Sequence, residues 1–266
     1  MAIAMITVHQ SPVDIWICGS PVSTAFVPNS DLMLLLLVRQ IIRLNVEYML
    51  IHDEGEFNSV SCGGRANVSD TFGQAIWLLD TILYAASINV SRMYVHQGAH
   101  AHYNLWSTVD NPNGPIEVFP SYSAYLFVTE AIGRQADGSS VTTAGGDLSA
   151  GQISVYGFWD EKSANSYDYP TKLALLNLEL YSQTDTYPRP DTTVDISAYL
   201  PKNTQEVTVK WLTAPGSDVV SASLTTWAGQ TFASGVAEGN IVEEKVSNGQ
   251  VVVKASSAAL VYWSVA

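Results

Sequence analysis

The sequence lacks the features that mark a disulfide-stabilised, metal-binding or nucleic-acid-binding protein. Two cysteines occur in 266 residues, Cys18 and Cys62, which excludes a disulfide framework and a thiolate-rich metal site. Twelve lysines and arginines stand against 25 aspartates and glutamates, giving a formal net charge of −13, and no basic run is present. Such a chain has no surface suited to phosphate backbones or anionic membranes. We therefore expect neither nucleic acid nor a membrane as a partner.

The sequence also shows no long hydrophobic run and no export signal. Its most apolar run, residues 32–38, is followed by arginines and is far shorter than the ~20 residues that cross a bilayer, so it predicts a buried helix. Residues 1–10 have no basic segment leading into an apolar core, so no signal peptide is visible. Two Asn-x-Ser triplets, at Asn67 and Asn89, nevertheless fit a glycosylated, secreted protein.

The first half of the sequence predicts alternating helices and strands. Hydrophobic residues make up 47% of the chain, enough for sizeable cores, but residues 1–30 show no sustained period and stay unassigned. Residues 31–45 predict a helix, and residues 46–56 predict a buried strand that ends at charged residues. A second strand is predicted at residues 91–98.

An amphipathic helix is predicted between these two strands, beginning at Ser69 or Asp70 as its N-cap. Its apolar residues recur three or four positions apart and therefore lie on one face: Phe72, Ile76, Leu79 and Leu83. Trp77 is expected in the core. Strand, helix and strand in succession predict a parallel α/β unit.

The second half of the chain has a different texture. Residues 121–132 predict one more helix, ended by Gly133. After residue 140 the chain consists of short alternating runs rich in Val, Thr, Ser, Trp and Tyr, separated by Gly, Asn and Pro. This pattern predicts an antiparallel β-sandwich over residues 136–266, preceded by an α/β domain over residues 31–135.

The strongest candidate for chemistry is Glu56, which stands at the end of a predicted parallel strand and before a Gly-rich turn, in the stretch EGEFNSVSCGG. Enzymes of the α/β class gather catalytic groups at that end of their strands. A solvated loop charge is an equally acceptable interpretation, because Asp53 and Glu54 lie beside it. His96, at the end of the next strand, would face the same opening or lie free on the surface.

Histidines and aromatic residues cluster after the second strand. His96, His100 and His102 offer three imidazoles, but the spacing of four and then two residues is a weak match to a zinc site, so we expect no metal. Tyr103 and Trp106 are suited either to core packing or to stacking on a sugar ring.

Several of these stretches together resemble glycoside hydrolase family 79, which includes β-glucuronidases and heparanases. The resemblance is dense over residues 54–106 and looser through the predicted sandwich. The motifs that carry it are GEFNS (55–59), the glycine pair 63–64, SDTF (69–72), HQG (96–98), YNLW (103–106), VKWLTAPGSD (209–218) and TTWAGQTF (225–232).

The resemblance implies a fold and a set of site residues. The family combines a (β/α)₈ TIM barrel with a β-sandwich, which implies that residues 31–135 are the last part of a barrel. It implies that Glu56 is the nucleophile of a retaining β-glycosidase and that His96 and Tyr103 line a glucuronate subsite. The substrate-binding set implied by the turn and these two residues is Asn58, Ser61, Gly63, His96 and Tyr103. No cofactor is implied, and the partner is a carbohydrate.

Two departures from the family pattern change the expectation. The family usually has tyrosine where this chain has Ser61, so we expect weaker selectivity for uronic acids. In the family the acid/base glutamate follows an asparagine, and no Asn-Glu pair occurs here; too few residues precede Glu56 for the first six strand–helix units of a barrel. We therefore expect an incomplete chain, inactive by itself, whose full-length parent is secreted.

Two other functions fit the sequence. One is a non-catalytic carbohydrate-binding or structural remnant, which an upstream barrel with an Asn-Glu strand end would argue against. The other is a metal-dependent hydrolase that uses the histidines, which would contain stoichiometric zinc. The sequence predicts no particular oligomeric state.

Overall fold

The computed structural model describes residues 4–8, 13–17, 20–25, 53–88, 90, 92–112, 114–133, 141–148, 152–160, 169–247 and 249–265, with side chains from residue 57 onward and, within 141–148, at 143, 145 and 146 alone. The elements, with η for 3₁₀ helix, are β1 (Ala4–Val8), β2 (Val13–Ile17), β3 (Ser20–Ala25), β4 (Asp53–Phe57), α2 (Phe72–Ser87), β5 (Arg92–Val95), β6 (Trp106–Ser107), β7 (Glu117–Val118), α3 (Tyr122–Ile132), β8 (Val141–Leu148), β9 (Ile153–Asp160), β10 (Lys172–Asn177), β11 (Asp191–Asp195), η2 (Ser197–Tyr199), β12 (Thr204–Thr213), η3 (Ala222–Leu224), β13 (Thr226–Trp227), β14 (Glu244–Val246), β15 (Gln250–Lys254) and β16 (Ser257–Val265).

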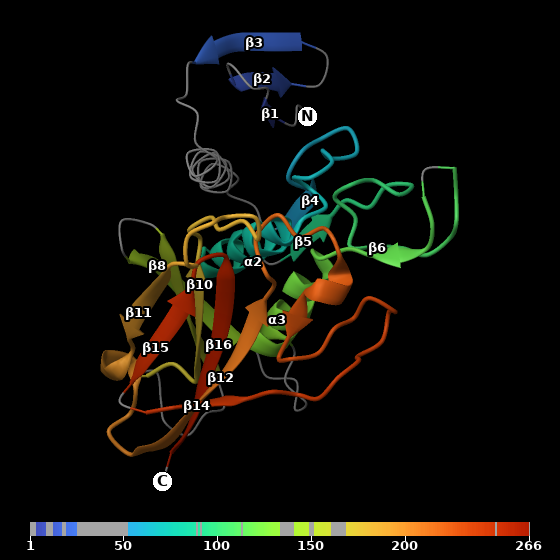
Figure 1. Ribbon diagram of the computed structural model, residues 1–266. Helices are drawn as coiled ribbons and strands as arrows, with labels where there is room; N and C mark the ends of the chain where they lie inside the picture. The colour runs from blue at the N-terminus through green and yellow to red at the C-terminus, as the bar shows by residue number, and fades with distance from the viewer. Residues whose placement is uncertain are drawn as a thin grey trace.

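A seven-stranded antiparallel sheet forms the centre of the second half of the chain (Figure 1). Its order is β13-β12-β16-β10-β9-β8, and β14 also pairs with β12. The alternating runs of the sequence become β9, β12 and β16 in this sheet, and β15 in a second, two-stranded sheet with β11. The prediction of an antiparallel β domain is therefore confirmed.

One face of the central sheet packs on the β11-β15 pair. Because successive side chains of a strand point to opposite faces, every second residue of the central strands contributes to this core. Its fully or nearly fully buried residues are Ile153, Val155, Leu173, Leu175, Val194, Ile196, Val207, Val209, Val251, Val253, Ala259 and Val261. The two sheets therefore form a sandwich.

The other face of the same sheet is covered by α2 and α3 (Figure 1). The alternate residues of the strands pack there against the apolar stripes of the helices, in a core that includes Phe72, Leu79, Leu83, Phe127, Tyr156, Phe158, Ala174, Leu176, Leu212 and Leu260. The central sheet is consequently buried on both faces, which explains the nearly continuous burial of β10.

The helix α2 forms where the apolar periodicity predicted it. Phe72, Ile76, Leu79 and Leu83 are all buried, and Trp77 is 6% exposed in the core. The predicted N-cap was wrong, because the cap is Thr71, whose hydroxyl accepts a hydrogen bond from the backbone N–H of Gln74. The two residues predicted as caps make other contacts. The Ser69 hydroxyl accepts a hydrogen bond from the backbone N–H of Arg65, and the carboxylate of Asp70 contacts His102.

The strands β4 and β5 pair in parallel, with α2 between them in the sequence. This confirms the predicted α/β unit. Among the described strands, β4 and β5 are the only pair that runs in parallel.

The helix α3 begins after Ser121 and ends at Gly133, as the sequence indicated. The strands β1, β2 and β3 form an antiparallel sheet in a region left unassigned from sequence. Pro21 is accommodated there because β3 is an edge strand.

Some sequence predictions fall on residues outside the described part of the chain. These are the helix at 31–45, most of the strand at 46–56, and the domain boundary near residue 136. Among the described helices, none combines the length and the apolarity that crossing a bilayer would take.

A buried hydrogen bond ties α2 to the central sheet. The Tyr156 hydroxyl, on β9, donates to the Asp80 carboxylate at 2.7 Å, and both residues are at most 5% exposed. We expect Tyr156→Phe to lower the free energy of unfolding by about 1–3 kcal/mol, because a buried carboxylate loses a donor. Urea unfolding measures this. Tyr199→Phe, on a 38% exposed residue, is the control, and equal losses in the two variants would contradict the prediction.

The loop before β11 is held by Asp218, whose carboxylate accepts hydrogen bonds from the Ser182 hydroxyl and the Gln183 backbone, each at 2.8 Å. Partial burial acts to raise the pKa of Asp218, but these hydrogen bonds outweigh it and the pKa is lowered below its ordinary value. A lowered folded-state pKa stabilises the fold above the unfolded-state pKa, and this contribution is lost as the pH falls through the folded value.

We therefore expect Asp218→Asn to lower the melting temperature at neutral pH, and the difference from wild type to shrink in acid below the ordinary aspartate range. Thermal unfolding followed between neutral and acidic pH measures both. A difference that stays constant or widens on acidification would show that the carboxylate's charge is not what holds the loop.

Candidate functional site

The backbone of β4 is irregular where the candidate nucleophile stands. The register pairs Glu54 with Met93 and Phe57 with Val95, so β4 advances three residues while β5 advances two. The extra residue of this bulge falls at 55–56, which includes Glu56. Bulges redirect side chains locally and recur beside active sites. Glu56 thus lies at the carboxyl end of a parallel strand, at a point of altered strand geometry.

The glycine pair that follows is required by the path of the chain. Gly63 and Gly64 have φ of +100° and +80°, values that other residues adopt only with strain. At Gly64 a Cβ would also lie 2.9 Å from the backbone nitrogen of Tyr103. The carbonyl of Gly63 accepts a hydrogen bond of 2.7 Å from the backbone of His102. The turn after β4 therefore packs directly on the loop after β5.

The structure brings His96 and Tyr103 together. His96 follows β5, and its backbone N–H donates to the Phe57 carbonyl at 3.0 Å, which continues the pairing with β4. The Tyr103 hydroxyl lies 2.8 Å from Nδ1 of His96, and the ring centroids are 5.6 Å apart. Tyr103 is 4% exposed, whereas His96 is exposed. The buried phenol of Tyr103 thus holds an imidazole that is exposed to solvent.

The carboxamide of Asn58 joins the two loops. Its Nδ2 donates to the carbonyls of His96 at 3.0 Å and Tyr103 at 3.2 Å. Its Oδ1 accepts from the Ser59 backbone at 2.8 Å and from Nε2 of Gln74 at 3.0 Å. Gln74 was missed in the sequence. The available signal was a polar residue on the buried side of α2, where it is 4% exposed.

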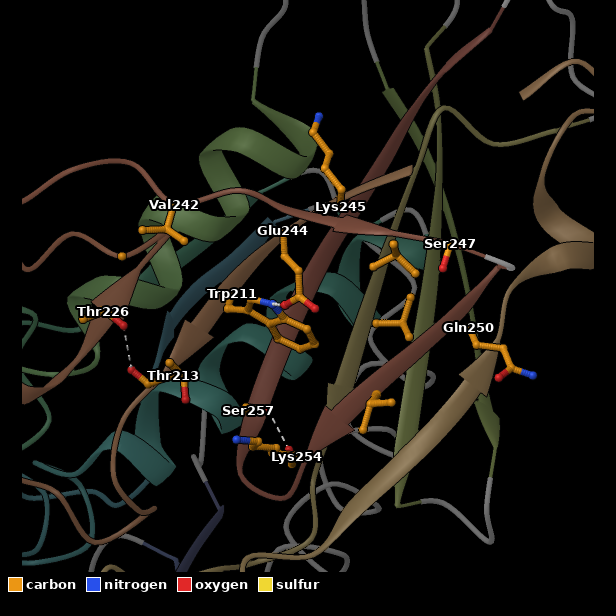
Figure 2. A pocket seen from close by; sticks show the side chains of 14 residues that line it. Trp211, Thr213, Thr226, Val242, Glu244, Lys245, Ser247, Gln250, Lys254 and Ser257 are labelled. Atoms are coloured by element: carbon orange, nitrogen blue, oxygen red, sulfur yellow. Dashed lines mark hydrogen bonds between the residues drawn. The ribbon is translucent and has the colours of Figure 1, made fainter. Parts of the chain in front are cut away.

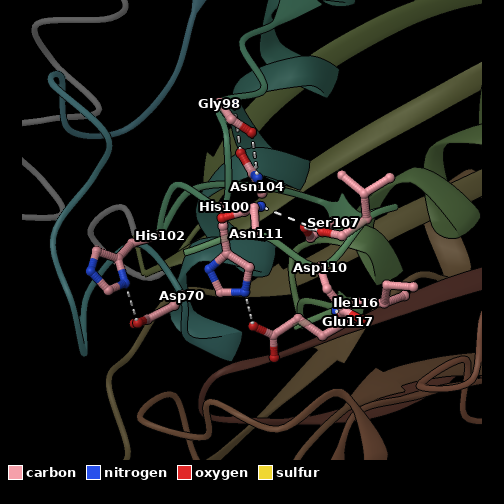
Figure 3. Close-up of polar contacts among 11 residues, drawn as sticks. Asp70, Gly98, His100, His102, Asn104, Ser107, Asp110, Asn111, Ile116 and Glu117 are labelled. Atoms are coloured by element: carbon pink, nitrogen blue, oxygen red, sulfur yellow. Dashed lines mark hydrogen bonds and ion pairs between the residues drawn. The ribbon is translucent and has the colours of Figure 1, made fainter. Parts of the chain in front are cut away.

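The three clustered histidines have separate partners. While His96 contacts Tyr103, Nδ1 of His102 lies 3.0 Å from the Asp70 carboxylate, and Nε2 of His100 lies 2.7 Å from Glu117 (Figure 3). The second contact has an ion-pair distance without good hydrogen-bond geometry. Within the described part of the chain, no three metal-ligating side chains come together.

The remaining predicted residues lie around the same turn. Ser61 is partly buried, with its hydroxyl 3.6 Å from the sulfur of Cys62. Asn67 is exposed in the turn before α2 with φ of 58°, and Asn89 lies outside the described residues. Trp106, on β6, is 41% exposed and contacts Tyr122 edge to face.

A groove of about 690 Å³ lies elsewhere, in the β domain (Figure 2). Trp211 stands in it with its indole N–H donating to Glu244 at 2.7 Å. The lining residues come from β12 to β16 and the segments between them, and the predicted site residues are not among those described around it. This groove and the candidate chemistry are therefore in different places.

Comparison with known proteins bears on the β domain first. Residues 155–260 match the model of the "Glycosyl hydrolase family 79 C-terminal beta domain". This segment is therefore similar to the C-terminal β domain of family 79. It begins within β9 and ends within β16, so it includes most of the central sheet and the β11-β15 pair that closes the sandwich.

The similarity to curated relatives extends beyond residues 155–260. A beta-glucuronidase of Neurospora crassa is 28% identical over 198 residues, covering 67% of this chain and 35% of that protein. A beta-glucuronidase of Aspergillus niger is 26% identical over 212 residues, covering 74% of this chain and 36% of that protein. The chain thus spans about a third of these relatives' length. A solved GH39 enzyme from Xanthomonas axonopodis pv. citri covers 100% of this chain and 53% of its own at 13% identity, with a TM-score of 0.39.

The close approach at Gly64 gives a test of the site's packing. We expect Gly64→Ala to destabilise the fold by about 1–3 kcal/mol, because it adds strain at positive φ and presses on the backbone of Tyr103. Gly146→Ala is the matched control, since a Cβ there meets no atom within 4 Å. Urea unfolding of both variants measures the difference, and a neutral Gly64→Ala would contradict the packing described.

Proposed function

We propose that the loops after β4 and β5 form part of the active site of a retaining β-glycosidase of the β-glucuronidase type, with Glu56 as nucleophile. The observation that carries the proposal is the convergence of four predicted residues on the loops after β4 and β5. The backbone of Glu56 lies in the bulge of β4, and Asn58, two residues later, is hydrogen-bonded to the backbones of His96 and Tyr103. The names of the two curated relatives support the choice of substrate class.

The chemistry of retention explains the arrangement. A carboxylate attacks the anomeric carbon and forms a glycosyl-enzyme, while a second carboxyl group about 5 Å away protonates the departing oxygen and later activates water. The nucleophile has to remain ionised in order to attack. We assign the second carboxyl group to no residue of this chain.

His96 and Tyr103 are proposed to contact the sugar. Their mutual hydrogen bond fixes the imidazole, which is exposed, while the phenol is buried beneath it. An oriented imidazole and a hydroxyl suit the hydroxyl and carboxylate oxygens of a glucuronate ring. Ser61 offers a shorter donor than the tyrosine usual in the family, so we propose weaker selectivity for uronic acids. Secretion and glycosylation at Asn67 and Asn89 are parts of the same proposal.

Covalent labelling tests the nucleophile. In an active form of the protein, a mechanism-based 2-fluoro glycoside should label the peptide that contains Glu56, as read by mass spectrometry, and Glu56→Gln should remove both label and turnover, because an amide cannot form the intermediate. Glu54→Gln, two residues away, is the matched control and should keep the label. Label on Glu47, Glu54 or Glu117 would overturn the assignment.

The alternative, a non-catalytic carbohydrate-binding remnant, gives a different outcome in the same experiment. It predicts binding of the sugar without any covalent label. The groove beside Trp211 is a hollow that such a function could use.

A further inference from the structure

The carboxamide of Asn58 has no hydrogen-bonding capacity left for a ligand. A primary amide has two donor hydrogens and an oxygen with two lone pairs. Both donors are used by the carbonyls of His96 and Tyr103, and the oxygen is used by Ser59 and Gln74. A residue saturated in this way acts on its surroundings by holding them in place.

Gln74 is one of the four groups that fix the orientation of that amide. Two donors, the Ser59 backbone and Nε2 of Gln74, point at one end of the Asn58 side chain, and two carbonyls face the other end. Turning the amide around would put its NH₂ group against donors and its oxygen against carbonyls. Because Gln74 is 4% exposed, water does not readily replace its donor.

The two carbonyls that Asn58 holds belong to the residues whose side chains are bonded to each other. His96 and Tyr103 are seven positions apart, yet both backbones are anchored on one nitrogen, and the ring nitrogen and the hydroxyl meet at 2.8 Å. A shift of the amide therefore changes the separation of the two rings.

We propose that Gln74 is a positioning residue of this site, acting through Asn58 to hold His96 and Tyr103 in hydrogen-bonding register for a sugar. The inference rests on the proposed function and deepens it. Asn58 then serves the architecture rather than the sugar, and α2 contributes to the site through Gln74 without touching substrate. Both amides are neutral, so they orient the pair without adding charge to the site.

The test reads the His96 ring directly and needs no ligand. With ¹⁵N-histidine in the 266-residue chain, the two ring-nitrogen shifts of His96 report which nitrogen carries the proton and whether Nδ1 keeps its partner. In the wild type one neutral tautomer should dominate, because Tyr103 holds Nδ1. In Gln74→Met, which keeps the length and removes the donor, the two shifts should move toward each other as the tautomers average.

A matched control separates positioning from general stability. Asn177 is a fully buried amide of the β domain that donates to the Val253 carbonyl and accepts from the Glu179 backbone, each at 3.0 Å. Asn177→Leu should lower the melting temperature in the same way as Gln74→Met but leave the His96 shifts unchanged. Equal changes of the His96 shifts in both variants would overturn the proposal.

A second variant covers the case in which Gln74→Met fails to fold. Gln74→Glu keeps the size and polarity, but its carboxylate cannot donate to Asn58 at neutral pH, so it should also shift the His96 signals. If a folded Gln74 variant has the same His96 ring-nitrogen shifts as the wild type, the proposal is wrong. Methyl β-D-glucuronide, added to the wild type, tests the proposed function separately. Absence of any change in the His96 ring shifts would count against that function while leaving the tautomer result intact.

Discussion

The central sheet buries both of its faces, and the remainder of the described structure follows from this constraint. One face closes on β11 and β15, and the other on α2 and α3. Strands in this position need apolar residues at consecutive positions, as β10 and β16 have, rather than the strict alternation of a half-exposed sheet. The helices thereby close a second core, on the face of the sheet opposite the core of the sandwich.

The core between the helices and the sheet gives the candidate site a rigid base. Along one side α2 packs on the sheet and is tied to β9 through Asp80, while its first turn carries Gln74 to the turn after β4. Side chains placed by a packed helix are held more precisely than those on loops alone. The β domain therefore supports the site mechanically, although none of the described site residues comes from it.

The sequence allowed several of the helices and strands to be predicted, because their signals are local. The periodicity of α2, the stop at Gly133 and the alternating runs of the β domain each depend on neighbours in the chain. The two-sided burial of the sheet, the bulge at Glu56 and the bond between Gln74 and Asn58 depend on partners far away in sequence, so no local pattern reveals them. The cap at Thr71 was missed because the hydroxyl of Ser69 is used within the preceding turn, where it accepts a hydrogen bond from the backbone of Arg65.

The saturation of the Asn58 amide has a consequence for motion. Its four hydrogen bonds connect the turn after β4, the first turn of α2 and the loop after β5, so none of the three can open without breaking bonds to another. Segments linked in this way exchange their amide hydrogens as one cooperative unit rather than as independent loops. The conformational entropy of these segments is already lost when the protein folds. A ligand that binds there therefore does not have to order the protein, and little of its binding free energy is offset in this way.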